Sequence, residues 1–519
     1  MSDYDVIVVG AGHNGLTAAT VLAKEGLKVL DLEKNGYVGG MAATREVIKG
    51  FKHNVGAWVL MFFSRKHMEL LGLEKYGLEL IEPTSSCCVL GVPGENPFIM
   101  YSDMSKLIDH LQKDHGEDAA RGFVGLLQFL RPFAEILAAT RDTPISIGAM
   151  IDQAPNIQAK DALRKIIYGS AMDVVDEFFP DPQKHRHIRS AIGGMGSDGS
   201  SLGPYDLGTA CAFAYHMVPI GFGRSWKLVK GGMGMLSEAL KRSFEEKGGD
   251  VRLNARVKRI LVKNDNAIGV ELADGEKIAS KVVLSNIDAY STFMGMVGEE
   301  NLPSDFVHMV KGIKYGTPYI QIHFALKELP EFTRDLAFIN KDNLRWFVNR
   351  TYGPEEFQRC LDAVRWGRLP EKPMWTYYIP SIWDDSMAPP GYHSLTLYSF
   401  DFPVMAPGAL HEKLKVEMVD KLIDDVDRHA PNFRDAILDR VVFTSMHFER
   451  MFGITKGDYC HGRLLPQQMF DFRPVVGWSG YNTPVENLYL CGSACHPGAG
   501  VTGMPGYNSA REVLKNWKR

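Results

Sequence analysis

Hydrophobic residues form short unbroken runs near both ends of the chain. Val6 to Val9 is a wholly apolar, β-branched run, which predicts a buried strand of a parallel sheet. Residues 28–33 predict a second strand, and residues 487–492 predict another near the far end. The first and last runs each lead into a glycine-rich turn and then a helical pattern. This order predicts an α/β fold with a doubly wound sheet.

The pattern changes twice in the middle of the chain. Residues 66 to about 224 are mostly helical in pattern, and Pro132 is expected to kink or break a helix over residues 123–137. Residues 251–284 alternate as strands do, with a hairpin signal at Asp274-Gly275. Residues 291 to about 454 predict a second domain. Its strands are expected at 319–326, 374–380 and 393–402, and its helices at 354–366 and 410–429.

Two stretches of this middle region have an open interpretation. In the strand at 319–326, alternation places Tyr319, Gln321 and His323 on one face, and this polar face suggests a substrate smaller or more polar than a carotene. The glycine-rich stretch 193–203 predicts a flexible loop, which either covers a site or merely connects two elements.

The first turn has the chemistry of a dinucleotide site. In Gly10-x-Gly12-x-x-Gly15, the first glycine makes the turn, the second lets the backbone approach a pyrophosphate, and the third allows close helix packing. The phosphates are expected at the free N–H groups of the helix start. Glu33 follows Gly15 at the spacing of an acid that accepts from ribose hydroxyls. The neighbouring candidates for cofactor binding are His13, Asn14 and Lys34.

After Glu33 comes Gly39-Gly40-Met41, and the chain here resembles the large flavoprotein group with a GxGxxG…E…GG signature, which includes amine oxidases and phytoene desaturases. The block from Lys230-Gly-Gly-Met-Gly to Ser285-Asn-Ile-Asp and the C-terminal stretch from His496 to Gly506 resemble the phytoene desaturases most closely. The resemblance implies bound FAD without a covalent link. It also implies backbone contacts to the cofactor from Gly39, Gly40, Met41, Gly56, Ala57, Val257, Gly492, Gly500, Val501, Gly503 and Met504.

The resemblance also implies a layout of interleaved segments. Residues 1–65, 225–290 and 455–519 are expected to form a discontinuous, Rossmann-like FAD domain. Residues 66–224 and 291–454 are expected to form a substrate domain with helices and a mixed or antiparallel sheet.

The function that follows is an FAD-dependent oxidoreductase that abstracts hydride from a C–H bond and leaves a C=C bond. Because no second GxGxxG lies in mid-chain, oxygen, a quinone or another acceptor is expected to take the electrons. His461, His496 and His323 are the candidates for a catalytic base, although His496 is equally suited to a structural role. The alternatives are a flavin amine oxidase, a flavin-dependent C=C isomerase and a non-catalytic flavoprotein that acts as an interaction module.

Composition narrows the expected partners and the expected location of the protein. The 519 residues are 45% hydrophobic with a formal net charge of −4, which gives no indication of nucleic-acid binding. The expected partner is a small apolar or amphiphilic substrate, and a homo-oligomer is left open. The apolar stretches fall short of the roughly 20 residues of a membrane span, so we expect a cytoplasmic protein, with peripheral membrane contact left open. The seven cysteines predict reduced thiols and no metal site.

Asp31 departs from the usual apolar character of the second strand. An ionised, unpaired carboxylate buried in such a strand would cost several kcal/mol. We therefore expect Asp31 to be paired or protonated.

Overall fold

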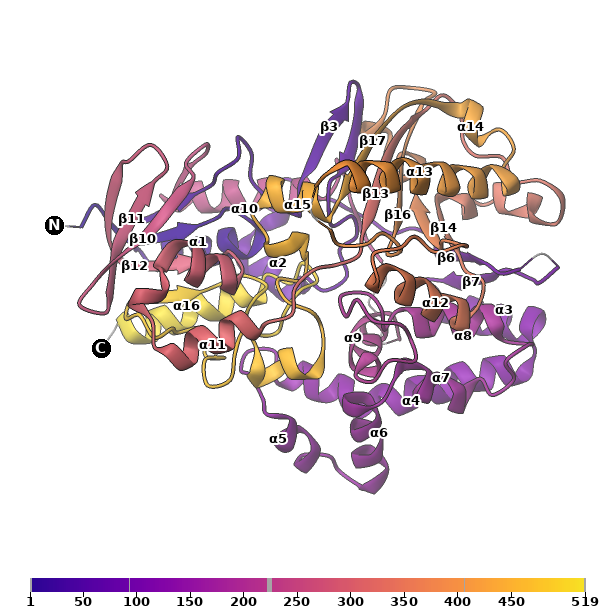
Figure 1. Ribbon diagram of the computed structural model, residues 1–519, viewed down its shortest axis with the longest axis horizontal. Coiled ribbons are helices and arrows are strands. Elements are labelled where there is room, and N and C mark those ends of the chain that lie inside the picture. The colour runs from indigo at the N-terminus through magenta and orange to yellow at the C-terminus, as the bar shows by residue number, and fades with distance from the viewer. Residues whose placement is uncertain (1, 93, 222–225, 406, 518–519) are drawn as a thin grey trace.

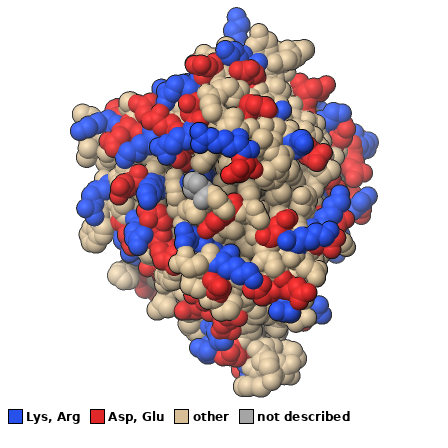
Figure 2. Space-filling model, turned by 90° about the vertical axis from the view of Figure 1, so that its right-hand side faces the viewer, with Lys and Arg blue, Asp and Glu red and all other residues tan. Residues whose placement is uncertain are grey.

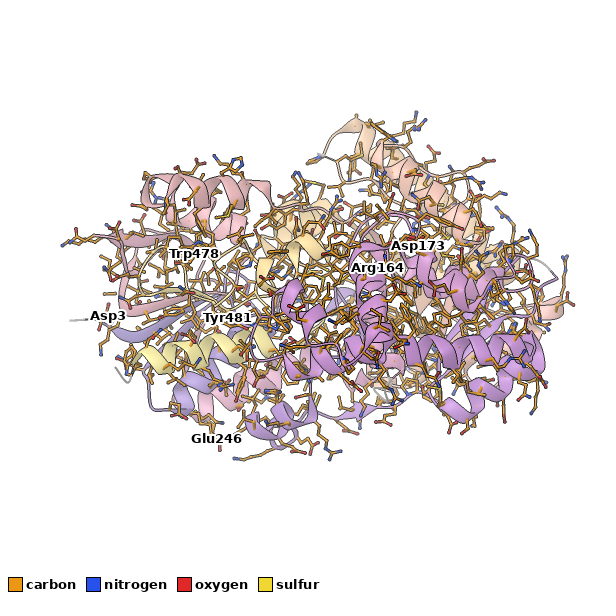
Figure 3. All side chains as sticks on the ribbon, turned by 90° about the horizontal axis from the view of Figure 1, so that it is seen from below. Asp3, Arg164, Asp173, Glu246, Trp478 and Tyr481 are labelled. Atoms are coloured by element: carbon orange, nitrogen blue, oxygen red, sulfur yellow. The ribbon has the colours of Figure 1, made fainter. Side chains whose placement is uncertain are left out.

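The computed structural model describes residues 2–92, 94–221, 226–405 and 407–517. Two seven-stranded sheets lie side by side, and a group of helices lies below the second sheet (Figure 1). Figure 3 shows the same division from below, with Trp478 and Tyr481 in the half that holds the first sheet and Arg164 and Asp173 among the helices of the other half. The α/β class expected from the sequence is confirmed.

The first sheet is built on a parallel core. The central strand β1 pairs with β2 on one side and β12 on the other, so that Val6 lies opposite both Val29 and Val282. Strand β9 extends the core beyond β2, strand β18 pairs with β12, and the antiparallel hairpin β10–β11 continues from the start of β12. The bounds are β1 Tyr4–Val9, β2 Val29–Leu32, β9 Asp250–Arg252, β10 Val257–Lys263, β11 Asn266–Leu272, β12 Lys277–Ser285 and β18 Leu488–Leu490.

These strands come from the three segments assigned to the FAD domain, whose boundaries stay a prediction. The helices α1 (His13–Lys24), α10 (Gly234–Glu246) and α16 (Met504–Trp517) cover one face of the sheet, where Val6 and Val8 lie in their shared core. On the other face, Ile7 and Val9 pack with the β10–β11 hairpin and with helix α11 (Ser304–Gly312).

The second sheet runs in the order β17-β13-β16-β15-β14-β6-β7 and is antiparallel except for the pair β14–β6. Two of its strands, β6 and β7, come from the region where the sequence predicted mostly helices. The long helix α13 (Ala409–His429) packs against the face that carries Ile320, Ile322 and Phe324. The bounds are β6 Ser85–Leu90, β7 Phe98–Tyr101, β13 Ile320–Leu326, β14 Phe347–Arg350, β15 Trp375–Tyr378, β16 His393–Ser399 and β17 Ile437–Thr444.

The polar face of β13 is buried rather than open to a cavity. His323 stacks near His53, with 4.9 Å between ring centroids, and the Gln321 amide lies 3.4 Å from the Asn54 carbonyl oxygen. His53 and Asn54 belong to β4 (Phe51–Asn54), which forms a hairpin with β3 (Thr44–Ile48). Of this face, only Tyr319, just before the strand, lines a cavity described below. The expectation of a substrate smaller or more polar than a carotene therefore has no support from this face and stays a prediction.

Helices fill most of the remainder. Helix α4 (Glu117–Ala139) runs without a break through Pro132, and Phe123, Leu126 and Leu130 pack into the helical core. Its length and apolar composition alone would allow it to cross a membrane, but core helices of soluble proteins pass the same test, and 33% of its most apolar window is buried. The other bounds are α2 Arg65–Leu71, α3 Met104–His110, α5 Ile147–Asp152, α6 Ile157–Tyr168, α7 Ala171–Phe178, α8 Arg186–Gly194, α9 Thr209–Gly221, α12 Pro354–Arg365, α14 Phe433–Ala436 and α15 Ser445–Phe452, with the short strands β5 Leu80–Ile81 and β8 Leu228–Val229.

The stretch 193–203 is not the flexible loop that its glycines predicted. It comprises the end of α8 and a series of turns, and Ser197 and Ser200 are buried in it. The Ser200 hydroxyl donates to the Gly196 carbonyl oxygen, and the Leu464 amide donates to the Gly199 carbonyl oxygen at 2.8 Å. The stretch is therefore packed into the protein, which fixes the side chains that it carries.

Candidate active site

The three glycines of the first turn lie as the motif requires. A Cβ on Gly15 would lie 2.2 Å from the Gly10 carbonyl oxygen, so only glycine allows helix α1 to pack this closely. A Cβ on Gly12 would lie 2.7 Å from Nδ2 of Asn286, which itself donates to the Gly10 oxygen. Gly12 precedes α1, whose first turn contains no acidic residue and receives no side-chain cap. The helix start therefore has N–H groups available to an anion.

The second glycine pair lies against the first turn. The Gly39 amide donates to the Ala11 carbonyl oxygen at 2.8 Å, and Gly39 and Gly40 have φ values of +110° and +53°. Gly10, Gly12, Gly39, Gly40 and Met41 line one cavity of about 80 Å³, which we call the glycine cavity. The GxGxxG and GG motifs thus converge on one small space.

Glu33 faces this cavity from the end of β2. Its Oε2 accepts from the Ala11 amide at 3.1 Å, and its Oε1 accepts from the Asn35 amide at 2.9 Å. Burial raises the pKa of the Glu33 carboxyl above its ordinary value of 4.5, and these hydrogen bonds oppose that rise. Lys34 instead donates to the Arg450 carbonyl oxygen. The segment before Val257 runs beside the acid, because the Ala255 amide donates to the Glu33 carbonyl oxygen at 2.8 Å.

Buried polar atoms at this cavity lack a protein partner. Nε2 of His13, Oδ1 of Asn14 and Nδ1 of His461 are buried without a hydrogen bond among the described residues, and all three residues line the glycine cavity. Burial lowers the pKa of both His13 and His461 to about 4, so both rings are neutral at neutral pH. A polar ligand would satisfy these atoms, since unpaired buried polar groups are unfavourable.

A second cavity of about 210 Å³, the ring cavity, continues from the first. The two share His13, Met41, Tyr459 and Ser493. Turns from both ends of the chain line the ring cavity at Gly56, Ala57, Gly500 and Val501. A polar, glycine-walled space leads directly into an aromatic one, as required for a dinucleotide with a flat ring at one end. The residues present therefore fit FAD.

Other C-terminal candidates pack rather than line a cavity. A Cβ on Gly492 would lie 2.6 Å from the Asn286 carbonyl oxygen, and a Cβ on Gly503 would lie 2.7 Å from the Phe63 ring. Gly503 has φ of +69°, and Met504 begins α16 with 1% exposure. Their proposed contact with FAD stays a prediction, whereas Gly500, with φ of +113°, lines the ring cavity itself.

A third cavity of about 200 Å³, the distal cavity, extends from the ring cavity into the substrate half. The two share seven residues: Trp58, Val59, Met61, Asp198, His216, Tyr398 and Phe400. Apolar side chains such as Val89, Met100 and Phe347 line the distal walls, and Arg350 and Asp401 lie among them.

Sequence reasoning missed Asp198 and His216. Asp198 belongs to the packed stretch 193–203. The sequence feature that could have identified it is that it is the one acidic residue among glycines and serines there. His216 lies on α9, in an apolar helix that gives no such indication.

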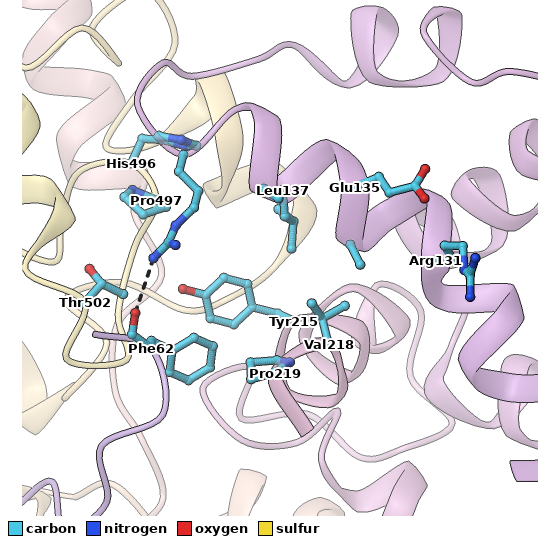
Figure 4. A pocket seen from close by; sticks show the side chains of 13 residues that line it. Phe62, Arg131, Glu135, Leu137, Tyr215, Val218, Pro219, His496, Pro497 and Thr502 are labelled. Carbon is cyan, nitrogen blue, oxygen red and sulfur yellow. Dashed lines mark hydrogen bonds between the residues drawn. The ribbon is translucent and has the colours of Figure 1, made fainter. Parts of the chain in front are cut away.

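A fourth cavity, of about 380 Å³, lies between α4, α9 and the C-terminal turn (Figure 4). Arg141 lines it and donates to the Phe62 carbonyl oxygen at 3.3 Å. The rings of Phe62 and Tyr215 are stacked with 5.3 Å between centroids, and both residues also line the ring cavity. This aromatic pair therefore separates the two spaces.

The three histidines proposed as bases occupy three different surroundings. His461 lines the glycine cavity, and His496 lines the cavity beside α4, where its Nε2 lies 2.8 Å from the Thr140 carbonyl oxygen. His323 is fully buried in β13 with Nδ1 3.0 Å from Oγ1 of Thr396. The structure thus brings none of the three together with another, and their catalytic role stays a prediction.

Asp31 is fully buried, and neither carboxyl oxygen has a hydrogen-bond partner among the described residues. Burial, with the nearby Glu33 charge, raises the pKa of Asp31 well above its ordinary value. Burial therefore favours the neutral acid at Asp31, which is one of the two expected states.

The cysteines and the surface charges complete the description of the molecule. All seven cysteines are free and buried, and among the described residues no group of His, Cys, Asp and Glu is arranged to hold a metal ion. On the face shown in Figure 2, Lys and Arg side chains alternate with Asp and Glu side chains over the surface.

This fold and site define an FAD-dependent oxidoreductase. The chain belongs to the family of flavin-containing amine oxidoreductases, which it matches over residues 15–513. It is 28% identical to the mouse (Mus musculus) protein named pyridine nucleotide-disulfide oxidoreductase domain-containing protein 2, over 99% of this chain and 94% of the relative. It is 26% identical to one of the subunits of limonene dehydrogenase from Castellaniella defragrans, over 99% and 94%. Among solved structures, an oxidoreductase from Methanosarcina mazei superposes with a TM-score of 0.62 at 16% identity, covering 98% of this chain and 100% of the other.

Proposed function

We propose that this enzyme dehydrogenates a small apolar or amphiphilic substrate at a C–H bond and leaves a C=C bond. The observation that carries the proposal is the distal cavity, which opens from the ring cavity and is walled mainly by aromatic and aliphatic side chains. The similarity to the limonene dehydrogenase polypeptide, whose name denotes oxidation of a small hydrocarbon, supports the same class of substrate.

Different residues of this chain are placed to bind different parts of the cofactor. Glu33 is placed to accept from a ribose, and the start of α1, with Gly12 and Gly39, is placed to receive the pyrophosphate. Gly56, Ala57, Gly500 and Val501 would flank the ring. Bound FAD supplies the two-electron acceptor, and the protein supplies orientation and a site that excludes water.

The lining of the distal cavity favours an apolar substrate. The walls at Trp58, Phe347 and Tyr398 bring large aromatic surfaces to the ligand, and such surfaces bind apolar molecules through burial of area. Oxygen, a quinone or another small acceptor then takes the electrons from the reduced cofactor.

The test is anaerobic reduction of the purified, FAD-loaded protein. A cyclic monoterpene hydrocarbon, a long linear polyene and a primary alkylamine are each mixed with the enzyme, and the absorbance of oxidised flavin is followed. Reduction by the compact hydrocarbon, with an alkene-bearing product one unsaturation richer, supports the proposal. Reduction by the amine alone, with peroxide released in air, would instead show an amine oxidase.

Two controls complete this test. Dithionite must bleach the same sample, which shows that the bound flavin is reducible. The variant Trp58→Ala enlarges the cavity where its two parts meet and is expected to shift the preference toward bulkier substrates while FAD is retained. A flavin that dithionite reduces, but that no member of a broad substrate panel reduces, would favour the non-catalytic alternative.

A further inference from the structure

The ring cavity and the distal cavity meet at a small polar site. Of the seven residues that line both, Asp198 and His216 alone carry a carboxylate or an imidazole, and the other five are aromatic, aliphatic or thioether side chains. A substrate that extends from the distal cavity toward the flavin ring must pass this pair. Asp198 and His216 are therefore placed to contact the part of the ligand that reacts.

The hydrogen bonds of His216 assign its tautomer. Nδ1 of His216 lies 2.9 Å from the carbonyl oxygen of Ala212, one turn earlier in α9. A carbonyl oxygen can only accept, so Nδ1 carries the hydrogen. In the neutral ring Nε2 then has its lone pair free, and this atom faces Oδ2 of Asp198 at 3.6 Å.

Asp198 is held from the opposite side. The Tyr459 hydroxyl donates to Oδ1 of Asp198 at 2.6 Å, and Tyr459 also lines the ring cavity. Burial and the nearby Asp198 charge raise the pKa of Tyr459 well above its ordinary value, so the phenol remains a donor. Oδ2 of Asp198 lies on the Nε2 side of the ring, whereas in a catalytic triad the carboxylate holds the other nitrogen. The carboxylate is therefore placed to stabilise, through its charge, the N–H that forms when Nε2 takes a proton.

We propose that Nε2 of His216 accepts the proton that the substrate loses, that Asp198 stabilises the imidazolium so formed, and that Tyr459 positions Asp198. This inference rests on the proposed dehydrogenation. In that reaction one C–H bond breaks with its electron pair and hydrogen going to oxidised FAD. The neighbouring C–H bond breaks with its proton going to Nε2, and its electron pair becomes the second bond of C=C. One hydride and one proton leave, so atoms and electrons balance.

The surroundings support a proton acceptor rather than an ordinary surface ion pair. His216 and Asp198 line both cavities beside Trp58, Tyr398 and Phe400, which are large aromatic side chains. The side chains of His216 and Asp198 retain 17% and 40% exposure, so both are accessible to a ligand. Besides Tyr459, the other titratable groups that line the two cavities are His13, Cys87, Tyr215, Tyr319, Arg350, Tyr398, Asp401 and Cys460.

The first experiment needs no substrate. Holoenzyme labelled with ¹⁵N-histidine is studied by NMR, and the His216 signals are assigned by their loss in His216→Gln. We expect the signals of a ring that carries its hydrogen on Nδ1, and we expect the Nε2 signal to move in Asp198→Asn. His216 signals that are the same in wild type and Asp198→Asn would overturn the pairing, whatever the enzyme's substrate is.

The second experiment uses the substrate found by flavin reduction. His216→Ala and Asp198→Asn should retain FAD and slow single-turnover reduction by roughly 10²- to 10⁴-fold, the usual contribution of a general base. Added imidazole should partly restore His216→Ala, and the pH dependence of the reduction rate should disappear in that variant. Asp114→Asn is the matched control, because it breaks a histidine–carboxylate pair with His110, 2.7 Å apart, elsewhere in the protein.

The two proposals fail in different ways. If His216→Ala reduces its flavin at the wild-type rate and with the wild-type pH dependence, the base is wrong while dehydrogenation stands. If only amines reduce the flavin and Asp198→Asn loses amine binding without a change in the rate constant, the carboxylate is an ammonium ligand. If no compound reduces the flavin, the proposed function fails, and the NMR comparison of wild type with Asp198→Asn still decides the pairing.

Discussion

The guanidinium of Arg473 donates twice to the carbonyl oxygen of Ser493, through Nε at 2.9 Å and Nη2 at 2.6 Å. Its Nη1 donates to the carbonyl oxygens of Gly462 and Gln468, and the residue is 2% exposed. A single buried side chain thereby ties the C-terminal turn, which lines the cofactor cavities, to the segment that precedes it.

Replacing Arg473 should loosen this turn. Arg473→Met leaves several buried carbonyl oxygens without donors, at about 1–3 kcal/mol each. We expect the free energy of unfolding to fall by at least about 3 kcal/mol in urea denaturation, with weaker FAD retention. Arg473→Lys should also destabilise, because an ammonium cannot reproduce the planar fork. Arg164→Met, which breaks the exposed pair with Asp161, should change the stability by less than about 1 kcal/mol.

Glu33→Ala should weaken FAD binding without loss of the fold. A hydrogen bond to a charged carboxylate contributes roughly 1.5–3 kcal/mol, or on the order of ten- to a hundredfold in affinity. Equilibrium dialysis of FAD against the apoprotein measures the effect, and the exposed Glu69→Ala serves as the control. Equal affinity in both variants would remove Glu33 from the ribose site.

Asp31 should make the protein less stable as the pH rises. Its pKa is raised in the folded state, so the folded protein binds more protons than the unfolded chain above the ordinary pKa of 3.8. The stability linked to this group is then fully present below that value and is lost as the pH rises toward the folded-state pKa, by up to about 1.4 kcal/mol per pH unit. Asp31→Asn should remove this slope. The slope is measured by urea denaturation of the apoprotein at several pH values. If the free energy of unfolding changes with pH equally in wild type and Asp31→Asn, Asp31 is paired in solution.

Gly500 and Gly503 should respond differently to alanine. Gly503→Ala is expected to cost at least about 1–2 kcal/mol, from positive φ and contact with Phe63, and to leave the flavin spectrum unchanged. Gly500→Ala would press on Phe62, which lines the ring cavity, with a Cβ only 2.8 Å from its ring. Its flavin absorbance should therefore shift. Identical spectra in both holoproteins would place the ring elsewhere.

The parts of the site that could be predicted are those that local sequence determines. Gly10, Gly12 and Gly15 act within one turn, and Glu33 ends the strand next to it, so spacing alone indicated their arrangement. Asp198 and His216 could not be found in this way, because a packed turn and a separate helix bring them together in three dimensions. The burial of Gln321 and His323 could not be predicted for the same reason. Alternation showed which face they share, but nothing in it indicated that the β3–β4 hairpin would cover that face.

The parallel core also has a consequence for refolding. Tyr4 of β1 lies opposite Ser280 of β12, and the turn at residues 492–501 completes the ring cavity. Contacts between segments so distant in sequence form slowly. When the protein refolds from urea in the presence of FAD, the flavin spectrum of the holoprotein should therefore return in the slowest phase, after most of the helical circular dichroism has returned.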